Sequence, residues 1–458
     1  MSCVAEQTVE MTNTDKQFDT VIVGLGKTGF SCACYLADQN VEFAVTDSRN
    51  DPPMLAVIRE QYPQIPLYLG NFDTELLCNA NQLLISPGVS LREPAVANAI
   101  ASGVSVYGDI ELFSQNITAP VVAITGSNGK STVTTLIAEM ARAAGLKVGL
   151  GGNLGCPALD LLREGKVDVY ILELSSFQLE TVSSLNALAS VVLNVTEDHM
   201  DRYAGLEDYT IAKAHIYDGD GTMVINLDDP YVVKMRREER KVLGFTLADP
   251  PESVYGVRCY DNIRWLVRGS KKIMPVDMIR IAGEHNVANS LAALALGDAL
   301  KLPEEAMLKI LQTFAGLPHR CQWVAEVNGV RWYNDSKGTN VGAASAAIRG
   351  LADNKNVILI AGGDGKGADF NKLAEVASDH IRAAVVIGRD GPLLKQALQG
   401  IVSVYDASDM KAAVNTAAKL AVTGDVVLLS PACASFDMFK DYQARGHAFI
   451  KAVETLVS

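Results

Sequence analysis

The chain has 458 residues, of which 48% are hydrophobic and 20% charged, with 37 Gly and 16 Pro spread along it. This composition is typical of a soluble globular protein and excludes disordered, collagen-like and coiled-coil chains, and the length predicts about three domains. The formal net charge of −13 at pH 7 argues against nucleic acid and anionic membranes as partners.

The N-terminal segment and the cysteines predict where the protein works. Residues 1–16 hold three acidic side chains and no apolar core of the kind that an export signal needs, so we expect a disordered leader. No apolar run approaches the ~20 residues that span a bilayer, so no membrane span is expected. The eight cysteines are scattered without a CxxC pair or a metal-type Cys/His array, which favours the cytoplasm. The densest basic run, residues 234–241, is interrupted by two Glu and is interpreted as a solvated helix face.

Short β-branched runs alternate with glycine-rich turns and alanine-rich helical stretches, which is typical of α/β proteins with parallel sheets. In chain order, strands are predicted at residues 18–24, 41–47, 121–126, 169–174, 189–195, 356–363, 383–388 and 425–432, and a helix at 290–300. An Asn328-Gly329 pair between two further runs predicts a hairpin with a type I′ turn. We therefore expect a Rossmann-like N-terminal domain over 17–108, a central P-loop ATPase domain over 109–316 and a Rossmann-like C-terminal domain over 317–458.

The first glycine motif lies between a predicted strand and a predicted helix. Gly24, Gly26 and Gly29 form a GxGxxG pattern, and Asp47 closes the next strand. Such glycines allow a tight turn and a close approach to a pyrophosphate at a helix N-terminus, while the acidic residue can bind ribose hydroxyls. The motif predicts nucleotide or phosphate binding and by itself indicates NAD, but it leaves the nucleotide open.

A second strand-to-helix turn, TGSNGKST, spans residues 125–132. It ends in the Gly-Lys-Ser/Thr that places an ammonium on β- and γ-phosphates and a hydroxyl on Mg²⁺, although Ile124 stands where the full Walker pattern has Gly. Glu173 ends another strand, where its carboxylate can reach a Mg²⁺ beside Lys130 and Ser131. The pattern predicts an ATP site, and a second phosphate cradle argues against a simple dehydrogenase.

Further polar residues accompany the predicted strands. Asn194, Asp198 and His199 lie at or after the end of the strand at 189–195, and His199 is assigned to metal or phosphate binding. Lys213 lies in a predicted helix and is, by its pattern alone, an ordinary surface lysine.

Three polar turns follow predicted strands of the third domain, at residues 335–340, 362–367 and 430–436. Because ligands bind at the carboxyl ends of parallel strands, one cleft could hold an anion there. It would gather the side chains of Lys337, Thr339, Lys366 and Ser435. The alternative is three unrelated loops.

Seven segments in this order resemble the Mur ligases, the ATP-dependent enzymes that build the peptide stem of peptidoglycan. They are TGSNGKST (125–132), ELSSFQLE (173–180), NVTEDHMDRY (194–203), HNVANSLAA (285–293), GLPHR (316–320), NDSKGTN (334–340) and GGDGKGADF (362–370). Within the family, GLGKTG with SPGV (86–89), SSFQLE and SPACASFDMFKDYQARG (430–446) are similar to the members that add D-glutamate to UDP-N-acetylmuramoyl-L-alanine. In those members the GxGxxG belongs to a uridine-binding domain without NAD.

The resemblance implies a role for each matching residue. For ATP they are Gly126, Ser127, Asn128, Gly129, Lys130, Ser131, Thr132, Asn286, Asn289, His319, Arg320, Asp335 and Lys337. For the UDP substrate they are Leu25, Thr28, Asp47, Ser48, Arg49, Gly88, Asn153 and His199, and for D-glutamate Thr339, Lys366, Ser435 and Phe436. The implied ligands of two Mg²⁺ ions are Ser131, Glu173, His199 and Lys213, the last as a carbamylated lysine, and Lys130, Glu173, His199 and Lys213 are the implied catalytic residues.

The implied reaction forms an acyl phosphate from ATP and the substrate carboxylate, which the amine of D-glutamate then attacks, with the third domain closing on the second. We expect a monomer that binds small molecules and neither nucleic acid nor membrane. Three other readings stay open: an NAD-dependent oxidoreductase, a nonenzymatic ATP-binding switch, and another amide ligase such as a folylpolyglutamate synthase or the ligases adding alanine or a diamino acid.

Overall fold

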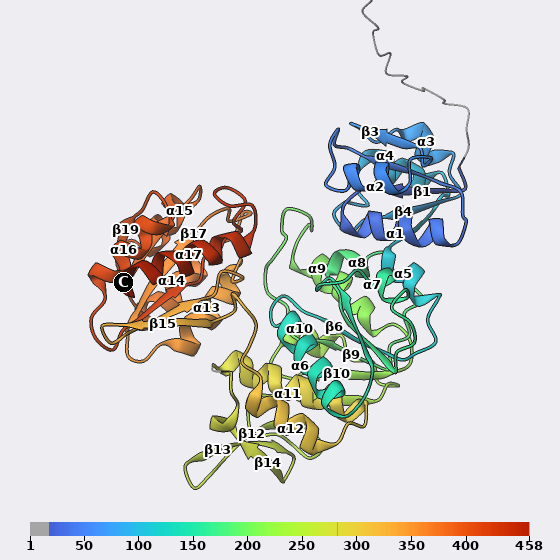
Figure 1. Cartoon of the computed structure of the whole chain (residues 1–458). Coiled ribbons are helices and arrows are strands. Elements are labelled where there is room, and N and C mark those ends of the chain that lie inside the picture. Colours follow the sequence, from blue (N-terminus) through green and yellow to red (C-terminus); the bar gives the residue numbers. More distant parts are fainter. Residues whose placement is uncertain (1–17, 282, 458) are drawn as a thin grey trace, which may run out of the picture. The chain divides into compact units, whose positions relative to one another are not determined.

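The computed structural model describes residues 18–281 and 283–457, which form three β-sheets with helices around them (Figure 1). The predicted leader lies outside the described residues. By its internal contacts the chain divides into two compact units. The first takes the described residues up to Thr118 together with 155–166 and 177–185, and the second takes the rest. None of the helices in the described ranges is long and apolar enough to cross a membrane.

The first unit is built on a five-stranded parallel sheet of order β3-β2-β1-β4-β5. Its strands are β1 (Thr20–Val23), β2 (Phe43–Asp47), β3 (Leu67–Leu69), β4 (Gln82–Ile85) and β5 (Ser105–Tyr107). Its helices are α1 (Lys27–Asp38), α2 (Leu55–Gln61), α3 (Thr74–Cys78), α4 (Pro94–Ala101), α5 (Asp109–Ser114) and α7 (Ala158–Leu161). Every residue of β1 is buried, as expected for a parallel strand covered on both faces, so the Rossmann-like prediction agrees with the structure.

The contacts of the first unit continue beyond residue 108, where we predicted the end of the first domain. α5 contacts α1 and α7, and the Ser31 hydroxyl donates to Asp160 Oδ1 over 2.6 Å. Glu111 Oε2 accepts from the backbone N–H groups of Ser183 and Ser184 at 2.6 and 2.9 Å. Residues 109–118 and the later segments 155–166 and 177–185 therefore belong to the unit of the first sheet. Long-range polar contacts of this kind leave no local signal in a sequence.

The second unit contains a nine-stranded sheet of order β14-β13-β12-β11-β10-β9-β6-β8-β7. Its strands are β6 (Val121–Thr125), β7 (Val148–Gly152), β8 (Val169–Glu173), β9 (Ala189–Val192), β10 (Thr222–Asn226), β11 (Val242–Phe245), β12 (Tyr255–Tyr260), β13 (Ile263–Arg268) and β14 (Lys271–Pro275). Its helices are α6 (Lys130–Ala143), α9 (Leu206–Ala214), α10 (Pro230–Lys234), α11 (Glu284–Ala299) and α12 (Glu304–Thr313), with 3₁₀ turns at His215–Tyr217 and Val276–Met278. Of the short helix α8 (Ser176–Leu179), only Ser176 belongs to this unit. Helices α6 and α11 pack together on this sheet, and their apolar residues share its core.

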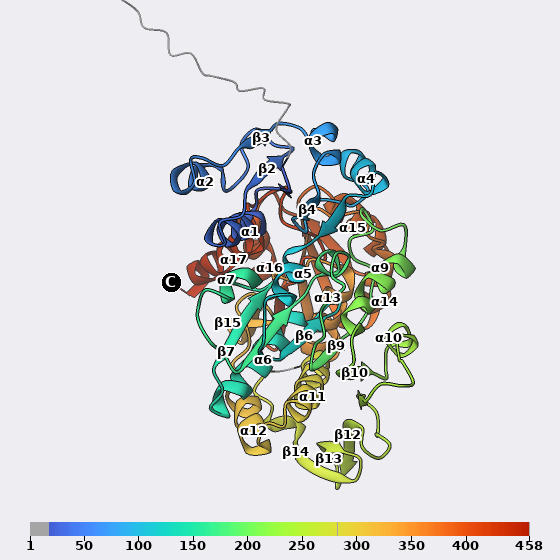
Figure 2. The same cartoon turned by 90° about the vertical axis from the view of Figure 1, so that its right-hand side faces the viewer.

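Two features of this unit differ from the sequence analysis or were absent from it. The antiparallel meander β12–β14 ends the sheet (Figures 1 and 2). The basic run at 234–241 is not a helix face, because α10 ends at Lys234. Arg237 instead pairs with Asp218 at 2.5 Å, and the Arg240 guanidinium donates to loop carbonyls, including that of Tyr217 at 2.7 Å. These tertiary partners favour a loop over a continued helix.

The same unit contains a six-stranded sheet of order β15-β16-β20-β17-β18-β19, parallel except for the first pair. Its strands are β15 (Gln322–Val327), β16 (Val330–Asn334), β17 (Val357–Gly362), β18 (Ile381–Ile387), β19 (Ser403–Asp406) and β20 (Val426–Leu429), and its helices α13 (Val341–Leu351), α14 (Asn371–His380), α15 (Gly391–Leu398), α16 (Met410–Leu420) and α17 (Tyr442–Val457). The predicted hairpin is present, with φ of 53° at Asn328 and 73° at Gly329, as a type I′ turn requires.

Alternate residues of β17 enter two separate cores. Leu359 packs in the core that includes residues of α13, α14 and α15, whereas Ile358 and Ile360 pack in the core that includes residues of α16 and α17. The helices therefore cover both faces of the sheet, as in doubly wound folds. This agrees with the Rossmann-like architecture predicted for residues 317–458.

Candidate active site

The predicted phosphate-binding turn connects β6 to α6 and keeps a shape that only glycine allows at its centre. Gly129 precedes α6 with φ of 85°, and a Cβ there would lie 2.4 Å from Asn289 Oδ1. Lys130 follows, and its Nζ donates to the carbonyls of Gly126 and Ser127 at 2.7 and 2.9 Å. The ammonium thus lies at the mouth of a helix N-terminus, where the backbone N–H groups favour an anion.

Residues after β9 hold this loop in place. Asn194 Oδ1 accepts from Asn128 N at 2.8 Å, and its Nδ2 donates to Asn128 O at 3.1 Å. The Ser127 hydroxyl donates to the carbonyl of Thr196 at 2.9 Å. Asn194, which the sequence placed only at this edge of the sheet, is therefore a support of the phosphate-binding loop.

Glu173 ends β8, which neighbours β6 in the sheet, and is 3% exposed. Its Oε1 accepts from Asn153 Nδ2 at 2.7 Å, while its buried Oε2 has no hydrogen-bond partner among the described residues. A buried carboxylate oxygen without a partner is costly, and it suits a cation. Mg²⁺ is usually held by one or two carboxylates together with substrate phosphates, so the described residues fit this ion even though they contain no group of three His, Cys, Asp or Glu able to hold a metal.

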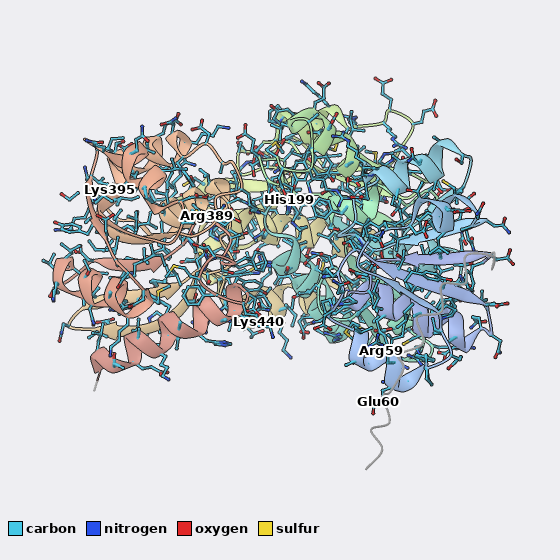
Figure 3. The ribbon with its side chains drawn as sticks, turned by 90° about the horizontal axis from the view of Figure 1, so that it is seen from above. Arg59, Glu60, His199, Arg389, Lys395 and Lys440 are labelled. Carbon is cyan, nitrogen blue, oxygen red and sulfur yellow. The ribbon has the colours of Figure 1, made fainter. Side chains whose placement is uncertain are left out.

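The other predicted metal ligands have different surroundings. Ser131 Oγ accepts from Arg320 Nη2 at 2.5 Å. His199 lies after β9 with φ of 58° and a side chain 36% exposed, and its Nε2 is 3.8 Å from Asp198 Oδ2 (Figure 3). Burial, with help from Lys366, lowers the pKa of His199, which favours the neutral imidazole that a metal requires.

Lys213 is buried, so the surface position that its pattern suggested is wrong. It lies in α9 and is 1% exposed. Its Nζ donates to Gly126 O at 3.0 Å and lies 4.3 Å from the centre of the Tyr209 ring. Burial above all, and then the Lys130 charge, hold the pKa of Lys213 well below its usual range. Its amine therefore has the neutral form available as a nucleophile at neutral pH.

Residues of the third sheet meet the same region. Lys366 Nζ lies 3.0 Å from Asp198 Oδ1, and Asn340 Nδ2 donates to Asp198 Oδ2 at 3.2 Å. Asn340 also donates to Asn128 Oδ1 at 3.2 Å. Burial, followed by the charges of Arg320 and Lys130, lowers the pKa of Lys337 to about 8.

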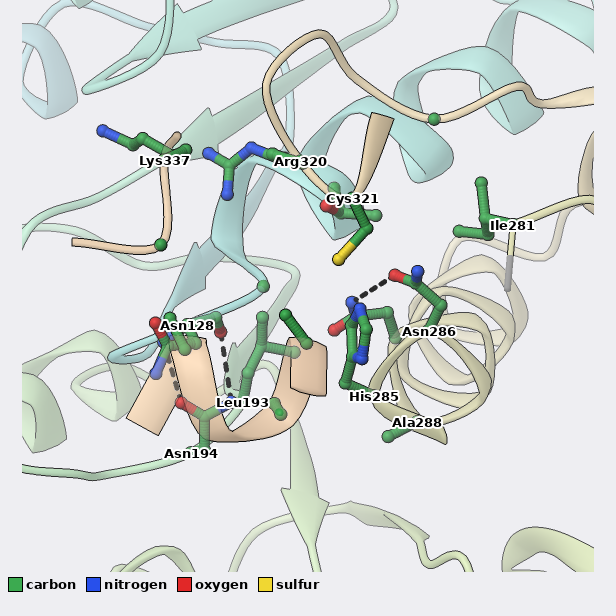
Figure 4. A pocket seen from close by; sticks show the side chains of 18 of the residues that line it. Asn128, Leu193, Asn194, Ile281, His285, Asn286, Ala288, Arg320, Cys321 and Lys337 are labelled. Atoms are coloured by element: carbon green, nitrogen blue, oxygen red, sulfur yellow. Dashed lines mark hydrogen bonds between the residues drawn. The ribbon is translucent and has the colours of Figure 1, made fainter. Parts of the chain in front are cut away.

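A pocket adjoins the phosphate-binding loop (Figure 4). It is lined by residues of that loop, of the start of α11 and of the segment around Arg320 and Asp335, including the predicted ATP contacts Asn128, Gly129, Thr132, Asn286, Asn289, Arg320, Asp335 and Lys337. Sequence reasoning missed Asn226, Phe245, His285 and Cys321, which also line it. Asn226 and Phe245 end β10 and β11, so the strand-end rule that found Glu173 could have found them.

Two predicted ATP residues are held within the third domain. Asp335 Oδ2 accepts from Ser430 Oγ at 2.7 Å, and burial raises the pKa of Asp335 to about 6. His319 is not among the pocket-lining residues. Its Nδ1 lies 2.9 Å from Asn334 Nδ2, and its ring packs edge-on against His447.

The candidate D-glutamate residues Thr339, Lys366 and Ser435 follow β16, β17 and β20, which are neighbours in the sheet. The three loops bond to one another: Ala432 N donates to Gly338 O at 2.9 Å, and Asp364 and Ala434 exchange backbone hydrogen bonds at 3.0 and 2.7 Å. They are therefore not unrelated loops.

The aromatic residue assigned to this group lies on the surface. Phe436 is 75% exposed. The aromatic ring that contacts a predicted site lysine is that of Tyr442, whose centre lies 4.2 Å from Lys337 Nζ.

Six of the predicted UDP residues belong to the first unit and lie at or after the ends of β1, β2 and β4: Leu25, Thr28, Asp47, Ser48, Arg49 and Gly88. The other two, Asn153 and His199, belong to the second unit. Asp47 accepts four hydrogen bonds: Oδ1 from the backbone N–H and Nε of Arg49, and Oδ2 from Leu25 N and Arg49 Nη2. Burial raises the pKa of Asp47, but these bonds outweigh it and lower the pKa overall. The four lone-pair sites are filled, so this carboxylate is no acceptor for ribose hydroxyls, which weakens the NAD reading.

Three family descriptions match the chain in order. They are the Mur ligase MurD-like N-terminal domain over residues 18–108, the Mur ligase middle domain over 124–297 and the Mur ligase glutamate ligase domain over 319–433. A UDP-N-acetylmuramoylalanine--D-glutamate ligase of Nitrosococcus oceani is 54% identical, covering 96% of this chain and 97% of its own. Its counterpart in Pseudomonas aeruginosa is 52% identical, covering 95% of this chain and 98% of its own.

A solved structure extends the comparison to the fold. UDP-N-acetylmuramate-alanine ligase of Thermotoga maritima matches 96% of this chain and 99% of its own with a TM-score of 0.59 and 17% identity. The sheets and the phosphate-binding loop define an α/β protein built to bind nucleotide phosphates. The chain belongs to the Mur ligase family.

Proposed function

We propose that this chain joins D-glutamate to UDP-N-acetylmuramoyl-L-alanine in peptidoglycan precursor synthesis, converting ATP to ADP and phosphate. The observation that carries the proposal is identity above 50%, over nearly the whole chain, to proteins named for this reaction. The site supports it, because the phosphate-binding loop, a buried unpartnered carboxylate oxygen and a group of cationic side chains occur together.

The first step brings two anions together, because the substrate carboxylate attacks the γ-phosphorus of ATP and ADP leaves. Lys130 would supply positive charge where the repulsion is greatest. Arg320 and Lys337 lie nearby: after burial, the Arg320 charge helps to lower the pKa of Lys337, and it also acts on Lys130. Asn286, Asn289 and Asp335 line the pocket in which the nucleoside would bind. The product of this step is an acyl phosphate.

Mg²⁺ fits the same residues. Glu173 Oε2 and the Ser131 hydroxyl would hold one ion, and His199 with a carbamylated Lys213 would contribute to a second. When bound, the ions supply positive charge to the phosphates during transfer. For the carbamate, the neutral Lys213 amine adds to CO₂, forming an N–C bond and releasing one proton, which turns the neutral amine into an anion.

In the second step the amine of D-glutamate attacks the acyl carbon and phosphate leaves. Lys366 and Thr339 would bind the amino acid's carboxylates with Ser435, fixing the amine in line with the carbonyl. Lys366 now pairs with Asp198, so a substrate carboxylate would replace that partner. The UDP end would bind through Leu25, Thr28, Ser48, Arg49 and Gly88, with Asp47 holding Arg49 in place.

The deciding experiment measures phosphate release from ATP in the presence of UDP-N-acetylmuramoyl-L-alanine. D-Glutamate should support turnover, whereas L-glutamate and a diamino acid should not. Turnover with another amino acid would overturn the assignment in favour of a different amide ligase. Phosphate release that needs no amino acid would point to an ATP switch, and tight NAD binding to an oxidoreductase.

We further propose that the protein is a cytoplasmic monomer. The described cysteines are all free, which agrees with a reducing compartment, and ATP is a cytoplasmic substrate. Light scattering coupled to size exclusion would test the monomer, and a mass near twice the 49.0 kDa of the chain would contradict it.

A further inference from the structure

Arg445 has an unusual environment for an arginine that the reaction does not use. It lies in α17 and is 1% exposed. Its guanidinium donates to Ser336 Oγ at 3.0 Å, Ser336 O at 2.8 Å, Cys433 O at 3.1 Å, Ala434 O at 3.2 Å and, more weakly, Gly362 O at 3.4 Å. One side chain therefore bonds to segments about 11, 83 and 109 residues away.

These acceptors lie on the three loops that carry the candidate amino-acid site. Ser336 follows β16 and lies three residues before Thr339, Gly362 ends β17 just before the loop of Lys366, and Ala434 precedes Ser435. The three strands are adjacent in the sheet, and Arg445 bonds to the last residue of β17 and to the segments that follow β16 and β20. A shift of this side chain would change the spacing among the three loops.

The surroundings of Arg445 are poor for stability alone. None of its hydrogen-bond acceptors is a carboxylate; all are backbone carbonyls or a hydroxyl. Burial lowers its pKa to about 10, so the group remains charged at neutral pH. A buried charge without an ion pair costs more than apolar side chains of similar volume would, so its presence calls for another reason.

The loops also contain strained backbone that needs support. Lys366 has φ of 51° and Ala432 has φ of 57°, in the left-handed region that non-glycine residues rarely adopt. Such conformations persist where the surroundings fix them, and they cluster at ligand sites. Arg445 bonds directly to the segment after Ala432 and to the residue that begins the loop of Lys366.

We propose that Arg445 is a positioning residue for the amino-acid substrate: its guanidinium sets the spacing of Thr339, Lys366 and Ser435, and through them the affinity for D-glutamate. The inference rests on the proposed function. It assigns Arg445 no contact with substrate. The ligand that depends on it is an amino acid with two carboxylates, because a dicarboxylate needs several anion-binding groups at fixed separations.

The test compares Arg445→Ala and Arg445→Lys with Phe449→Leu, a matched control one turn further along α17. Phe449 is fully buried in an apolar core and bonds to none of the loops. In the Arg445 variants kcat/KM for D-glutamate should fall by roughly 10- to 100-fold, mostly through KM, while KM for the UDP substrate changes by less than about twofold. Phe449→Leu should lower Tm but leave KM for D-glutamate unchanged.

A rescue experiment separates positioning from general damage. Millimolar methylguanidinium should lower KM of Arg445→Ala for D-glutamate, whereas methylammonium, which lacks the planar fork, should not. If the alanine variant does not fold, Ser336→Ala removes one acceptor of the same guanidinium and should raise KM for D-glutamate in the same direction by a smaller factor.

The outcomes distinguish two failures. A wild-type chain inactive with D-glutamate refutes the proposed function. If the wild-type chain is active, any of three results refutes the role of Arg445. The Arg445 variants keep a normal KM for D-glutamate, Phe449→Leu raises this KM as much as they do, or methylguanidinium and methylammonium rescue Arg445→Ala equally.

Discussion

The Lys213 amine lies among charged neighbours in a site closed to solvent, and this sets its chemistry. Burial, and then Lys130, lower its pKa, which makes the neutral nucleophile available to CO₂. We predict that Lys213→Ala loses roughly 100-fold in turnover and that formate or acetate restores part of it by taking the place of the carbamate. Turnover measured over a series of formate concentrations checks this. Chloride at equal ionic strength is the control, and activity that stays flat in formate would contradict the carbamate role.

Lys130 is the residue whose loss should separate catalysis from substrate binding. Its ammonium now bonds to two carbonyls of its own loop, from which it can turn to phosphate. Lys130→Met should reduce turnover by roughly 100-fold or more, because the variant loses the positive charge that stabilises the phosphoryl group during transfer. Affinity for the UDP substrate, measured by calorimetry without ATP, should stay near the wild-type value, since the predicted uridine contacts belong to the first unit. A parallel loss of that affinity would contradict this division.

Asp335 predicts a pH dependence of stability. Its pKa is raised from the usual value near 3.9 to about 6, so the folded chain retains a proton that the unfolded chain releases. Stability therefore falls as pH rises from about 4 to about 6, by on the order of 3 kcal/mol, and remains lower above that window. Asp335→Asn should remove this contribution, while that of Asp109, whose pKa burial also raises to about 6, remains. Tm of the variant relative to wild type should therefore rise with pH between 4 and 7. A difference in Tm that stays constant across this range would contradict the prediction.

The positions of individual candidate site residues were foreseen where the strand-end pattern is local. Glu173 and Lys130 sit at turns that the sequence displays directly. Burial of Lys213 was not foreseen from its own helix, because it depends on Tyr209 and on a loop 87 residues away. The contact of the Tyr442 ring with Lys337 was not foreseen for the same reason, because the two residues lie far apart in the chain.

At the scale of elements, the two ends of α6 offer a matched pair of glycines. Gly129 and Gly145 have φ of 85° and 88°, at the two ends of α6, but only Gly129 has a neighbour within reach of an added Cβ. Alanine at either position should cost about 1–2 kcal/mol of backbone strain. Only Gly129→Ala should also weaken ATP binding, because its methyl group would collide with Asn289. Melting curves and ATP-analogue titrations on both variants check this, and equal ATP affinity in the two would contradict it.

Most elements were predictable because the strand, turn and helix of a βα unit each have a local sequence pattern. Strand β17 reads as a short apolar run and the hairpin as an Asn-Gly pair, and both are present. The meander β12–β14 was not predicted because charged, exposed residues interrupt its apolar pattern, as in KKIMP of β14. The packing of α5 and α7 with α1 of the first unit was not predicted because it depends on tertiary contacts.

At the scale of the whole molecule, an acidic chain keeps its positive charge where anionic substrates react. The net charge is −13, yet four cationic side chains gather at this site. Burial lowers the pKa of Lys130 and of Lys337, and neighbouring cations lower both further: Arg320 and Lys366 at Lys130, Arg320 and Lys130 at Lys337. This local excess can attract ATP and a dicarboxylate while the remaining surface repels other polyanions.

These groups come from two sheets, and the reaction needs both sets at one centre. Lys130 and Glu173 belong to the nine-stranded sheet, and Thr339 and Lys366 to the six-stranded sheet. We therefore expect ligands to shift the chain toward closed arrangements, because the predicted ATP contacts come from both sheets and bind ATP more tightly when they meet. The radius of gyration from X-ray scattering should fall when an ATP analogue and the UDP substrate are added together. Lys130→Met, which loses a phosphate contact, should show a smaller decrease. Superimposable scattering profiles with and without both ligands would exclude a large closure and would require the two sheets to be held together before substrate binds.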